Sequence, residues 1–234
     1  MKVAIMQPYF LPYIGYFQLI NNVDKFVVCD NVQYIKEGWI NRNKLLINNT
    51  ATKFTLSLKK GSRDLKINER YLSERFEEEN KRLLKTIEMT YTKAPYISEV
   101  MPLISEILNC DYKVNIGEFN YNSLKKICKY IGIDTPFIMA SDIVKNNELK
   151  CQEMVIDMVK TLNADIYVNA IGGTELYSKK DFKERSIDLY FIKTNDIEYK
   201  QFKNAFIPNL SIIDVLMFNS KEQVKELLNQ YTLL

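Results

Sequence analysis

Short apolar runs and longer amphipathic runs alternate along this chain, and the alternation is clearest near its start. Residues 3–6 and 25–29 are apolar runs of strand length, which predicts two buried β-strands. The segment 12–23 between them can begin a helix, although it is short for a complete crossover helix. Residues 2–30 are therefore predicted to form a strand, a loop, a helix and a second strand.

The pattern becomes irregular after the second strand. Residues 31–50 are rich in polar and aromatic side chains, and we expect irregular structure there with a helical turn near residues 38–45. Residues 52–58 alternate and contain β-branched side chains, which predicts a strand. The basic run 59–64 that follows predicts a turn.

From about residue 68 to residue 131 the apolar positions recur at helical spacing. Three helices are expected, and Gly132 is expected to end the third. Pro102 is expected to move the start of the second helix beyond the point that periodicity alone indicates. These helices predict a mainly helical insertion or cap.

Strand and helix patterns alternate again after residue 135. The expected strands are 136–140, 165–170 and 187–192, and the expected helices are 148–162, 176–185, 211–218 and 221–228. Such alternation predicts an α/β fold with a mainly parallel, Rossmann-like sheet flanked by helices. We expect one domain over residues 1–234, with the helical insertion at about 68–131.

Composition narrows the functional classes. The 234 residues are 47% hydrophobic and 26% charged with a formal net charge of +3, too small to indicate nucleic acid or an anionic membrane as partner. The four cysteines form no C-x-x-C pair, so no zinc or iron–sulfur framework is expected. No signal-like start or apolar run of ~20 residues occurs. A reduced, cytoplasmic protein with no metal site is predicted.

The chain contains no histidine. Ser–His–Asp and Cys–His catalysis are therefore excluded, since both need an imidazole base. Any proton transfer must use Asp, Glu, Lys, Tyr or water.

A first candidate cluster follows the first predicted strand. Its members combine amide, aromatic and glycine chemistry at a strand end, where ligands of parallel α/β sheets bind, and they are Gln7, Tyr9, Tyr13, Gly15 and Tyr16. The layout is similar to the strand–loop–helix of nucleotidylyltransferases, but tyrosines replace both phosphate-binding histidines of that motif. The alternative interpretation is an aromatic hinge that packs the helix on the sheet.

A second candidate cluster follows the second predicted strand. A carboxylate, cations, an indole and amides occur together there, as Asp30, Gln33, Lys36, Trp39, Asn41, Arg42, Asn43 and Lys44. Arg42 and Lys44 suit phosphate or carboxylate groups, and Trp39 suits stacking on a base or sugar. The alternative interpretation is an ion-paired, hydrogen-bonded loop.

A third cluster contains Gly172, Gly173 and Tyr177. Two glycines at a strand end, with Thr174 as the expected N-cap of the next helix, could expose backbone N–H groups to an anion. A plain tight turn explains the pattern equally well. Near the end of the chain, Asn209 or Ser211 is expected to cap a helix with Asp214 in its first turn.

Four runs together resemble the WbqC-like protein family, and they are QPYFLPYIGYFQLI, DKFVVCDNVQYIKEGWINRNK, VNAIGGTELY and FIPNLSIIDVLMFN. The resemblance covers nearly the whole chain and is most specific in the N-terminal run. It implies a place in bacterial surface-polysaccharide (O-antigen) biosynthesis and, less directly, a glycine-transferase activity.

The resulting hypothesis is a transferase that moves an aminoacyl or acyl group to the amine of a nucleotide-linked sugar. Asp30 would accept the amine proton, with Lys36 as the second catalytic residue or as an anion ligand. The other residues of the three clusters would bind substrate. The donor needs activation, by ATP and Mg²⁺ or as an aminoacyl-tRNA, and nucleic acid is not otherwise expected. A non-catalytic nucleotide-sugar or partner-binding module is the alternative, followed by a nucleotidyl-transferring or adenylate-forming enzyme.

Overall fold

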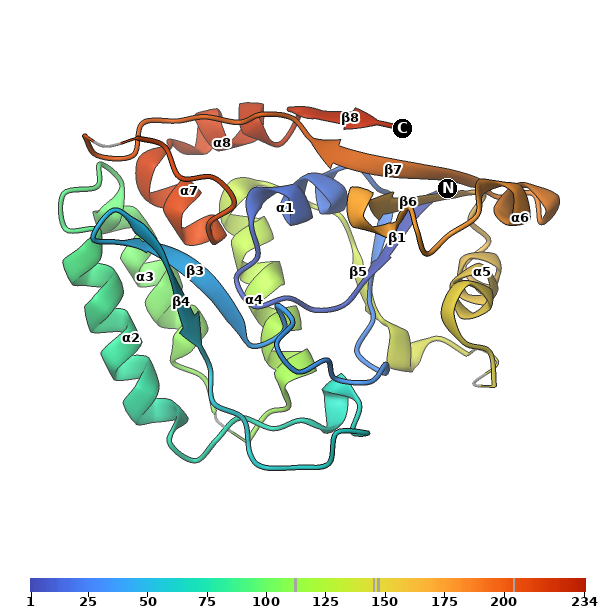
Figure 1. Cartoon of the computed structure of the whole chain (residues 1–234), viewed down its shortest axis with the longest axis horizontal. Helices are drawn as coiled ribbons and strands as arrows, with labels where there is room; N and C mark the ends of the chain where they lie inside the picture. Colours follow the sequence, from blue (N-terminus) through green and yellow to red (C-terminus); the bar gives the residue numbers. More distant parts are fainter. Residues whose placement is uncertain (112, 145, 147, 204) are drawn as a thin grey trace.

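A mainly parallel sheet forms the centre of the molecule (Figure 1). The computed structural model describes the chain except residues 112, 145, 147 and 204. The strand order is β5-β2-β1-β6-β7-β8, and neighbouring strands are parallel up to β7. The strands are β1 (Lys2–Met6), β2 (Lys25–Val28), β5 (Phe137–Met139), β6 (Ile166–Ala170), β7 (Asp188–Thr194) and β8 (Tyr231–Leu233). The predicted α/β class is confirmed, whereas the antiparallel edge strand β8 was not predicted.

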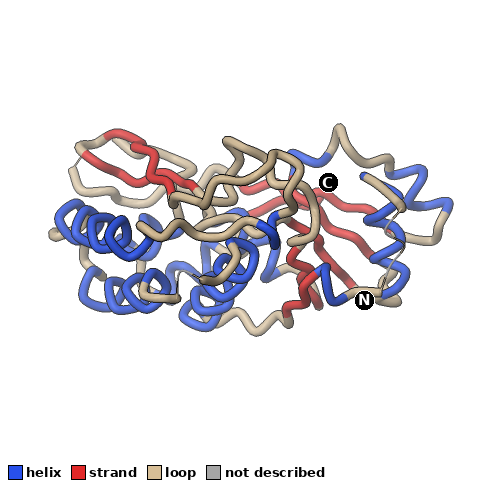
Figure 2. The backbone as a smooth tube through the Cα atoms, turned by 90° about the horizontal axis from the view of Figure 1, so that it is seen from below, coloured by secondary structure: helices blue, strands red, loops and turns tan. Residues whose placement is uncertain are grey.

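Helices cover both faces of this sheet because its central strands are apolar on both faces. Val3 and Ile5 of β1 pack with α5 and α6, whereas Ala4 packs toward α1, α4, α7 and α8. These helices are α1 (Ile14–Asn21), α4 (Ile116–Ile131), α5 (Cys151–Thr161), α6 (Lys179–Glu184), α7 (Ile212–Phe218) and α8 (Lys221–Leu227). Figure 2 shows the sheet with helices on both sides of it.

The strand order places a topological switch point between β1 and β6. From β1 the chain builds β2 and later β5 on one side, and it then crosses to build β6 and β7 on the other. Ligands of open α/β sheets bind at the carboxyl ends of the strands beside such a point. The carboxyl ends of β1, β2 and β6 are therefore the edge at which the fold itself favours a site.

The segment between β2 and β5 contains a hairpin and three helices. The hairpin pairs β3 (Arg42–Ile47) with β4 (Thr50–Thr55), and in Figure 2 it is the strand pair set apart from the main sheet. The expected helical turn near residues 38–45 is wrong, because β3 pairs along its whole length with β4. Asn48 and Asn49, both at positive φ, form the turn between them.

The helices of this segment are α2 (Phe76–Thr90), α3 (Ile97–Leu108) and α4, and they confirm the helical pattern over most of 68–131. Pro102 lies inside α3 instead of delaying its start. Burial of Val100, Leu103 and Ile104 on one face of α3 outweighs the hydrogen bond that proline removes. The buried apolar cluster is continuous from the sheet into α3 and α4. The single domain with an insertion stays a prediction.

The sequence predicts two helix caps, and the structure confirms one of them. Ser211 caps α7 as expected, because its hydroxyl accepts the N–H of Ile213. Thr174 does not cap the next helix, which starts later: the hydroxyl of Ser178 accepts the N–H of Asp181 at the start of α6. No helix within the described residues is long and apolar enough to cross a bilayer.

A buried carboxylate, Asp214, joins α7 to three other parts of the chain. It is fully buried and accepts hydrogen bonds from the Tyr91 hydroxyl at 2.8 Å, the Tyr199 hydroxyl at 2.7 Å and Gln201 Nε2 at 2.6 Å. The Tyr91 hydroxyl in turn accepts the backbone N–H of Leu46 in β3 at 3.2 Å. This network ties the hairpin to α7, because Asp214 and Tyr91 connect the two elements through consecutive buried hydrogen bonds.

We predict that Asp214→Asn lowers the free energy of unfolding by about 2 kcal/mol, because an amide turns an N–H₂ group toward hydrogen-bond donors. Urea unfolding of the variant beside the exposed-site control Asp134→Asn measures this loss. An equal stability for Asp214→Asn and the wild type would contradict the role given to the network.

The same pair of proteins gives a pH dependence. Burial raises the pKa of Asp214 in the folded state, although the bonds from Tyr199, Tyr91 and Gln201 lower it in part. A raised carboxyl pKa contributes stability that is present below the unfolded-state pKa and lost as pH rises through the folded-state pKa. The stability of the wild type relative to Asp214→Asn should therefore decrease from acid to neutral pH. A relative stability that increases from acid to neutral pH would contradict a raised pKa of Asp214 in the folded state.

Candidate functional site

A cavity of about 640 Å³ lies at the carboxyl ends of β1, β2 and β6, beside the switch point. Three separate stretches of chain supply most of its wall: residues 5–19, residues 29–43 and residues 169–177. Ten residues of the predicted clusters line it, and they are Gln7, Tyr9, Tyr13, Gly15, Tyr16, Trp39, Asn43, Gly172, Gly173 and Tyr177. The structure thus brings the two N-terminal connections and the Gly-Gly turn together in one pocket.

The loop between β1 and α1 forms the floor of this cavity, and side chains from distant elements hold it. Asn43 Nδ2 donates to the carbonyl oxygens of Phe10 and Leu11 at 2.9 and 2.8 Å. Asn120 of α4 donates to the carbonyl oxygen of Pro8 at 2.8 Å, and the Ser211 hydroxyl donates to that of Leu11 at 2.7 Å. An irregular buried loop needs such partners, because its carbonyl groups have no sheet or helix to bond.

Gly15 allows Tyr13 to lie close to the start of α1. A Cβ at position 15 would lie 2.4 Å from both Thr194 Oγ1 and the Tyr13 ring. The absence of a side chain at Gly15 therefore leaves the space that the Thr194 and Tyr13 side chains fill. Tyr16, by contrast, is almost fully buried and donates to the carbonyl oxygen of Gln7 at 2.7 Å.

The cavity wall carries no formal charge in the described part of the chain: no Asp, Glu, Lys or Arg lines it. Burial raises the pKa of the phenols of Tyr9, Tyr13 and Tyr177 above the ordinary tyrosine value. The phenols are therefore neutral at physiological pH and act as hydrogen-bond donors rather than bases. Such a wall fits a neutral group with both apolar and hydroxyl-bearing surfaces.

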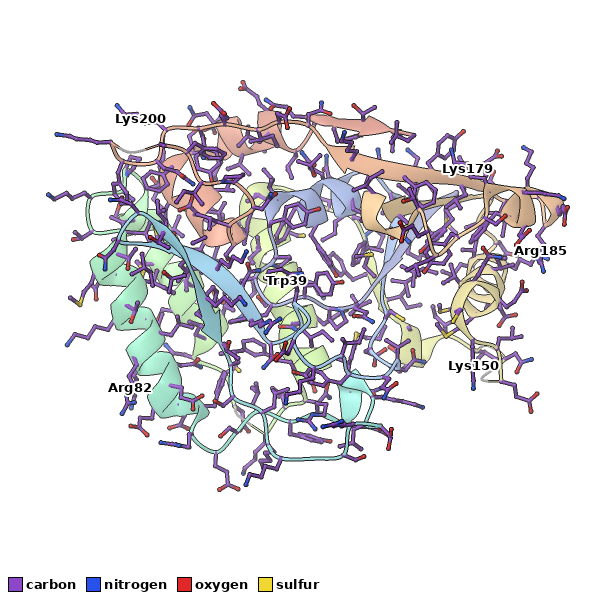
Figure 3. The ribbon with its side chains drawn as sticks, in the orientation of Figure 1. Trp39, Arg82, Lys150, Lys179, Arg185 and Lys200 are labelled. Carbon is purple, nitrogen blue, oxygen red and sulfur yellow. The ribbon has the colours of Figure 1, made fainter. Side chains whose placement is uncertain are left out.

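The cavity mouth is apolar and partly exposed. Trp39 is 40% exposed beside the hairpin (Figure 3), and the Lys44 ammonium lies 5.6 Å from the centroid of its ring. Ile35 lies on the same loop as Trp39, and Ile171 and Leu176 line the cavity from the loop that follows β6. Large exposed apolar side chains that share one cavity typically mark a binding surface.

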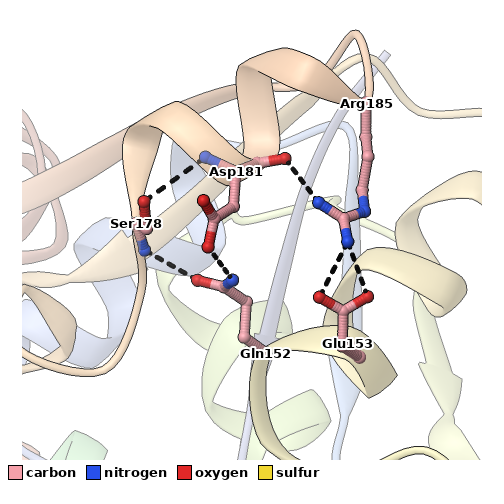
Figure 4. A network of polar contacts seen from close by, with 5 residues as sticks. All are labelled: Gln152, Glu153, Ser178, Asp181 and Arg185. Carbon is pink, nitrogen blue, oxygen red and sulfur yellow. Dashed lines mark hydrogen bonds and ion pairs between the residues drawn. The ribbon is translucent and has the colours of Figure 1, made fainter.

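Contacts between α5 and α6 fix the wall that faces β6 (Figure 4). Gln152 in the first turn of α5 accepts the Ser178 N–H at 2.7 Å and donates to the Asp181 carboxylate at 2.8 Å. Arg185 bonds both oxygens of Glu153 at 2.9 and 3.0 Å. These bonds hold the start of α5, which contributes Cys151, Met154 and Val155 to the cavity.

Six predicted site residues do not line the cavity, and Asp30 differs most from expectation. Its carboxylate is 1% exposed and accepts Asn68 Nδ2 and the Ser141 N–H, each at 3.0 Å. It lines a separate open hollow with Asn68, Ser141 and residues of α4. The side chain before it, Cys29, is the one that lines the cavity. In this geometry Asp30 joins the end of β2 to the segments around residues 68 and 141.

The remaining five residues lie around the hairpin and its approach. Asn41 is structural: it accepts the Tyr34 hydroxyl at 2.8 Å and donates to the Leu56 carbonyl oxygen at 2.7 Å. Gln33 is exposed and donates to the Arg63 carbonyl oxygen. Lys36 is exposed, whereas Arg42 and Lys44 are half-buried on β3. Of these, Lys44 is the one next to the mouth.

Sequence reasoning did not select several residues of the cavity wall. Asn169 lies near the end of β6, and its side chain is close to Gly173. Asn209 contacts the cavity from the long segment between β7 and α7, at positive φ. Cys29 lies at the end of an apolar strand pattern that indicates only burial, and Cys151 is an exposed residue at the start of α5. The position of Asn169 at a strand end was the one usable signal.

The fold and the site define an α/β protein with an uncharged ligand-sized cavity at the switch point of a parallel sheet. The model of the WbqC-like protein family matches residues 7–226, so the chain belongs to the WbqC-like protein family. It is also similar to the Uncharacterized protein Rv1507c of Mycobacterium tuberculosis, with 29% identity over 220 residues that cover 93% of each chain. No solved structure matches it significantly.

The adjacent glycines of the third cluster give a matched test of the cavity geometry. A Cβ on Gly173 would lie 2.6 Å from Asn169 Nδ2 and 3.3 Å from Tyr177, whereas one on Gly172 meets open space. We predict that Gly173→Ala costs about 1 kcal/mol of stability through overpacking, and that Gly172→Ala is neutral or slightly stabilising. Thermal unfolding of both variants measures the difference. Equal effects would contradict the packing described here.

The hydrogen bonds of Asn43 give a second test. Aspartate at this position has no N–H donor and places a charged oxygen against two carbonyl oxygens, so Asn43→Asp should cost about 3 kcal/mol. The control is Asn48→Asp in the exposed hairpin turn, where the change should be nearly neutral. Chemical unfolding compares them, and a tolerated Asn43→Asp would show that the loop is held by other contacts.

Proposed function

We propose that this protein transfers an acyl or aminoacyl group, a glycyl group above all, to the amine of a nucleotide-linked sugar in surface-polysaccharide biosynthesis. The pathway rests on the resemblance to the WbqC-like family and the family membership. The reaction rests on one observation, the uncharged cavity with aromatic and amide walls at the switch point. That cavity is suited to the neutral ring of a sugar rather than to its phosphates.

In this proposal the wall recognises the two kinds of surface that a sugar ring presents. Tyr9 and Trp39 offer aromatic faces for its apolar C–H side. Gln7 and Asn169 offer carboxamide groups that donate to and accept from hydroxyls. A small number of polar groups in an apolar wall orients a ligand without a net electrostatic field.

The same wall activates the amine without a side-chain base. Entry into an uncharged, desolvated cavity disfavours an ammonium group, so the bound amine releases its proton to water and becomes nucleophilic. Its nitrogen then attacks the carbonyl carbon of the donor, and the bond from that carbon to the leaving group breaks. The proton lost by nitrogen leaves with the leaving group or through water at the mouth. This route accounts for a transferase that has no histidine.

The donor needs prior activation, because amide formation from a free carboxylate in water is unfavourable. An adenylate made from ATP with Mg²⁺ and an aminoacyl-tRNA both stay as predictions. The catalytic roles of Asp30 and Lys36 also stay predictions. Of the two, Asp30 already has hydrogen-bond partners on both carboxylate oxygens, which favours a structural role.

A non-catalytic sugar-binding module is the second candidate. The observation that favours it is the same uncharged wall, since the described lining contains no Asp, Glu or Lys to act as a general base. Such a module would bind the nucleotide-linked sugar and give no product. Because Trp39 is the one tryptophan of the chain and lines the cavity, its fluorescence reports binding separately from turnover.

We predict a glycyl adduct when the protein is incubated with a nucleotide-linked amino sugar and glycine with ATP, or with a preformed aminoacyl donor. Mass spectrometry detects the product. Loss of the Trp39 side chain in Trp39→Ala should lower kcat/KM about 10-fold through lost stacking. Tyr190→Ala, at a side chain that is 39% exposed on β7, is the matched control and should leave kcat/KM unchanged.

Two further results decide between the candidates. Asp30→Asn should keep the wild-type pH profile of turnover if desolvation activates the amine, and should abolish turnover in the folded protein if Asp30 is the base. A fluorescence change on binding without product from any activated donor would favour the binding module and overturn the transferase proposal.

A further inference from the structure

The outward face of the β3–β4 hairpin carries cations beside the cavity mouth. Arg42 and Lys44 are two positions apart on β3 and so lie on the same face, about 7 Å apart along the strand. Asn43 between them faces inward to the N-terminal loop. Lys53 of β4 is paired directly opposite Lys44. The three cations therefore form one cluster on one face of the hairpin.

This cluster has no carboxylate counterion among the described residues, because none of Arg42, Lys44 and Lys53 makes an ion pair there. Like charges directly opposite on neighbouring strands destabilise the pair. Arg42 is also half-buried, with its Nε inaccessible to solvent and without a hydrogen-bond partner. Cations grouped in this way, without a carboxylate partner, favour an anion that pairs with them.

A second guanidinium lies near the first. Arg70 lies over the ring of Tyr34, with 5.0 Å from its central carbon to the ring centroid. Its two terminal nitrogens donate to the carbonyl oxygens of Ser62 and Lys59, while its Nε is buried without a partner. Burial raises the pKa of the Tyr34 phenol, and the positive charges of Arg70 and Arg42 oppose that rise in part. Arg70 therefore adds a positive charge beside Tyr34, in the segment that leads into β3.

We propose that this hairpin face binds the diphosphate of the substrate whose neutral ring occupies the cavity. The identity of the ring as a sugar rests on the proposed function. The presence of an anion beside it rests on the hairpin cations. Separated positive centres suit two linked phosphates better than one carboxylate, and guanidinium forks match phosphate oxygens. Lys44 contacts Trp39 at the mouth, so a phosphate there would lie next to the group held in the cavity.

Inorganic pyrophosphate tests this site without a knowledge of the full substrate. Isothermal titration calorimetry at low salt should show binding to the full chain, with affinity that falls as salt rises. Lys44→Gln and Lys53→Gln should each weaken binding about 3-fold to 10-fold, and Arg42→Gln at least as much. Lys81→Gln, an exposed site on α2, is the charge-matched control and should bind as the wild type does. Succinate, a dicarboxylate, should bind more weakly than pyrophosphate.

Three results would overturn the site: no binding of pyrophosphate, equal weakening by Lys81→Gln, or tighter binding of succinate. Lys53 is exposed, so its variant keeps the test valid if Arg42→Gln lowers stability. The outcome is separable from the transferase proposal. Pyrophosphate binding that depends on the hairpin cations would support the anion site even if no glycyl product forms. A glycyl product from a protein that does not bind pyrophosphate would contradict the anion site and leave the transferase proposal intact.

Discussion

Buried side-chain donors that hold one irregular loop are the constraint on which the site depends. The loop between β1 and α1 contains two prolines and the positive-φ residue Leu11, and it forms neither helix nor strand. Its carbonyl oxygens are bonded instead by Asn43, Asn120 and Ser211 from β3, α4 and α7. These donors satisfy carbonyl oxygens that neither a helix nor a sheet bonds, and Leu11 accepts from two of them. The conformation of the loop, and with it the floor of the cavity, therefore depends on hydrogen bonds from the hairpin and the helices.

This anchoring explains why the cavity is neutral and the charges lie outside it. Side chains that alternate along β3 send Asn43 inward and Arg42 and Lys44 outward. Alternation likewise turns Cys29 toward the cavity and Asp30 toward Asn68 and Ser141. The result is an uncharged cavity with a separate cationic face on the hairpin beside it. A carboxylate inside the cavity would oppose the free-amine state that the proposed reaction needs.

Much of the fold follows from sequence periodicity, because buried strands and amphipathic helices leave patterns that packing preserves. The strands β1, β2, β5, β6 and β7 and the long helices were predictable on that basis. The strand β3 was not, since RNKLLI has no β-branched residue before Ile47 and its conformation comes from pairing with β4. The Asn48–Asn49 turn was the available signal for that hairpin.

Only those site residues that directly follow a predictable strand could be placed from the sequence. Residues that directly follow β1 and β6 line the cavity, because the parallel sheet fixes where its carboxyl edge lies. Asp30 and Asn41 could not be placed in this way. Their partners, Ser141 for Asp30 and Tyr34 and Leu56 for Asn41, depend on how loops fold over the sheet edge. A polar side chain in a sequence indicates that it will have a hydrogen-bond partner. The sequence does not show whether that partner is a ligand or another part of the protein.

The most direct measurement is a crystal structure of the protein with a nucleotide-linked amino sugar. We expect the sugar ring to lie in the cavity between Tyr9, Trp39 and the Gly172–Gly173 turn, with its phosphates over the outward face of β3 and β4. A sugar bound in the hollow beside Asp30, or a cavity that stays empty while the ligand binds elsewhere, would contradict it.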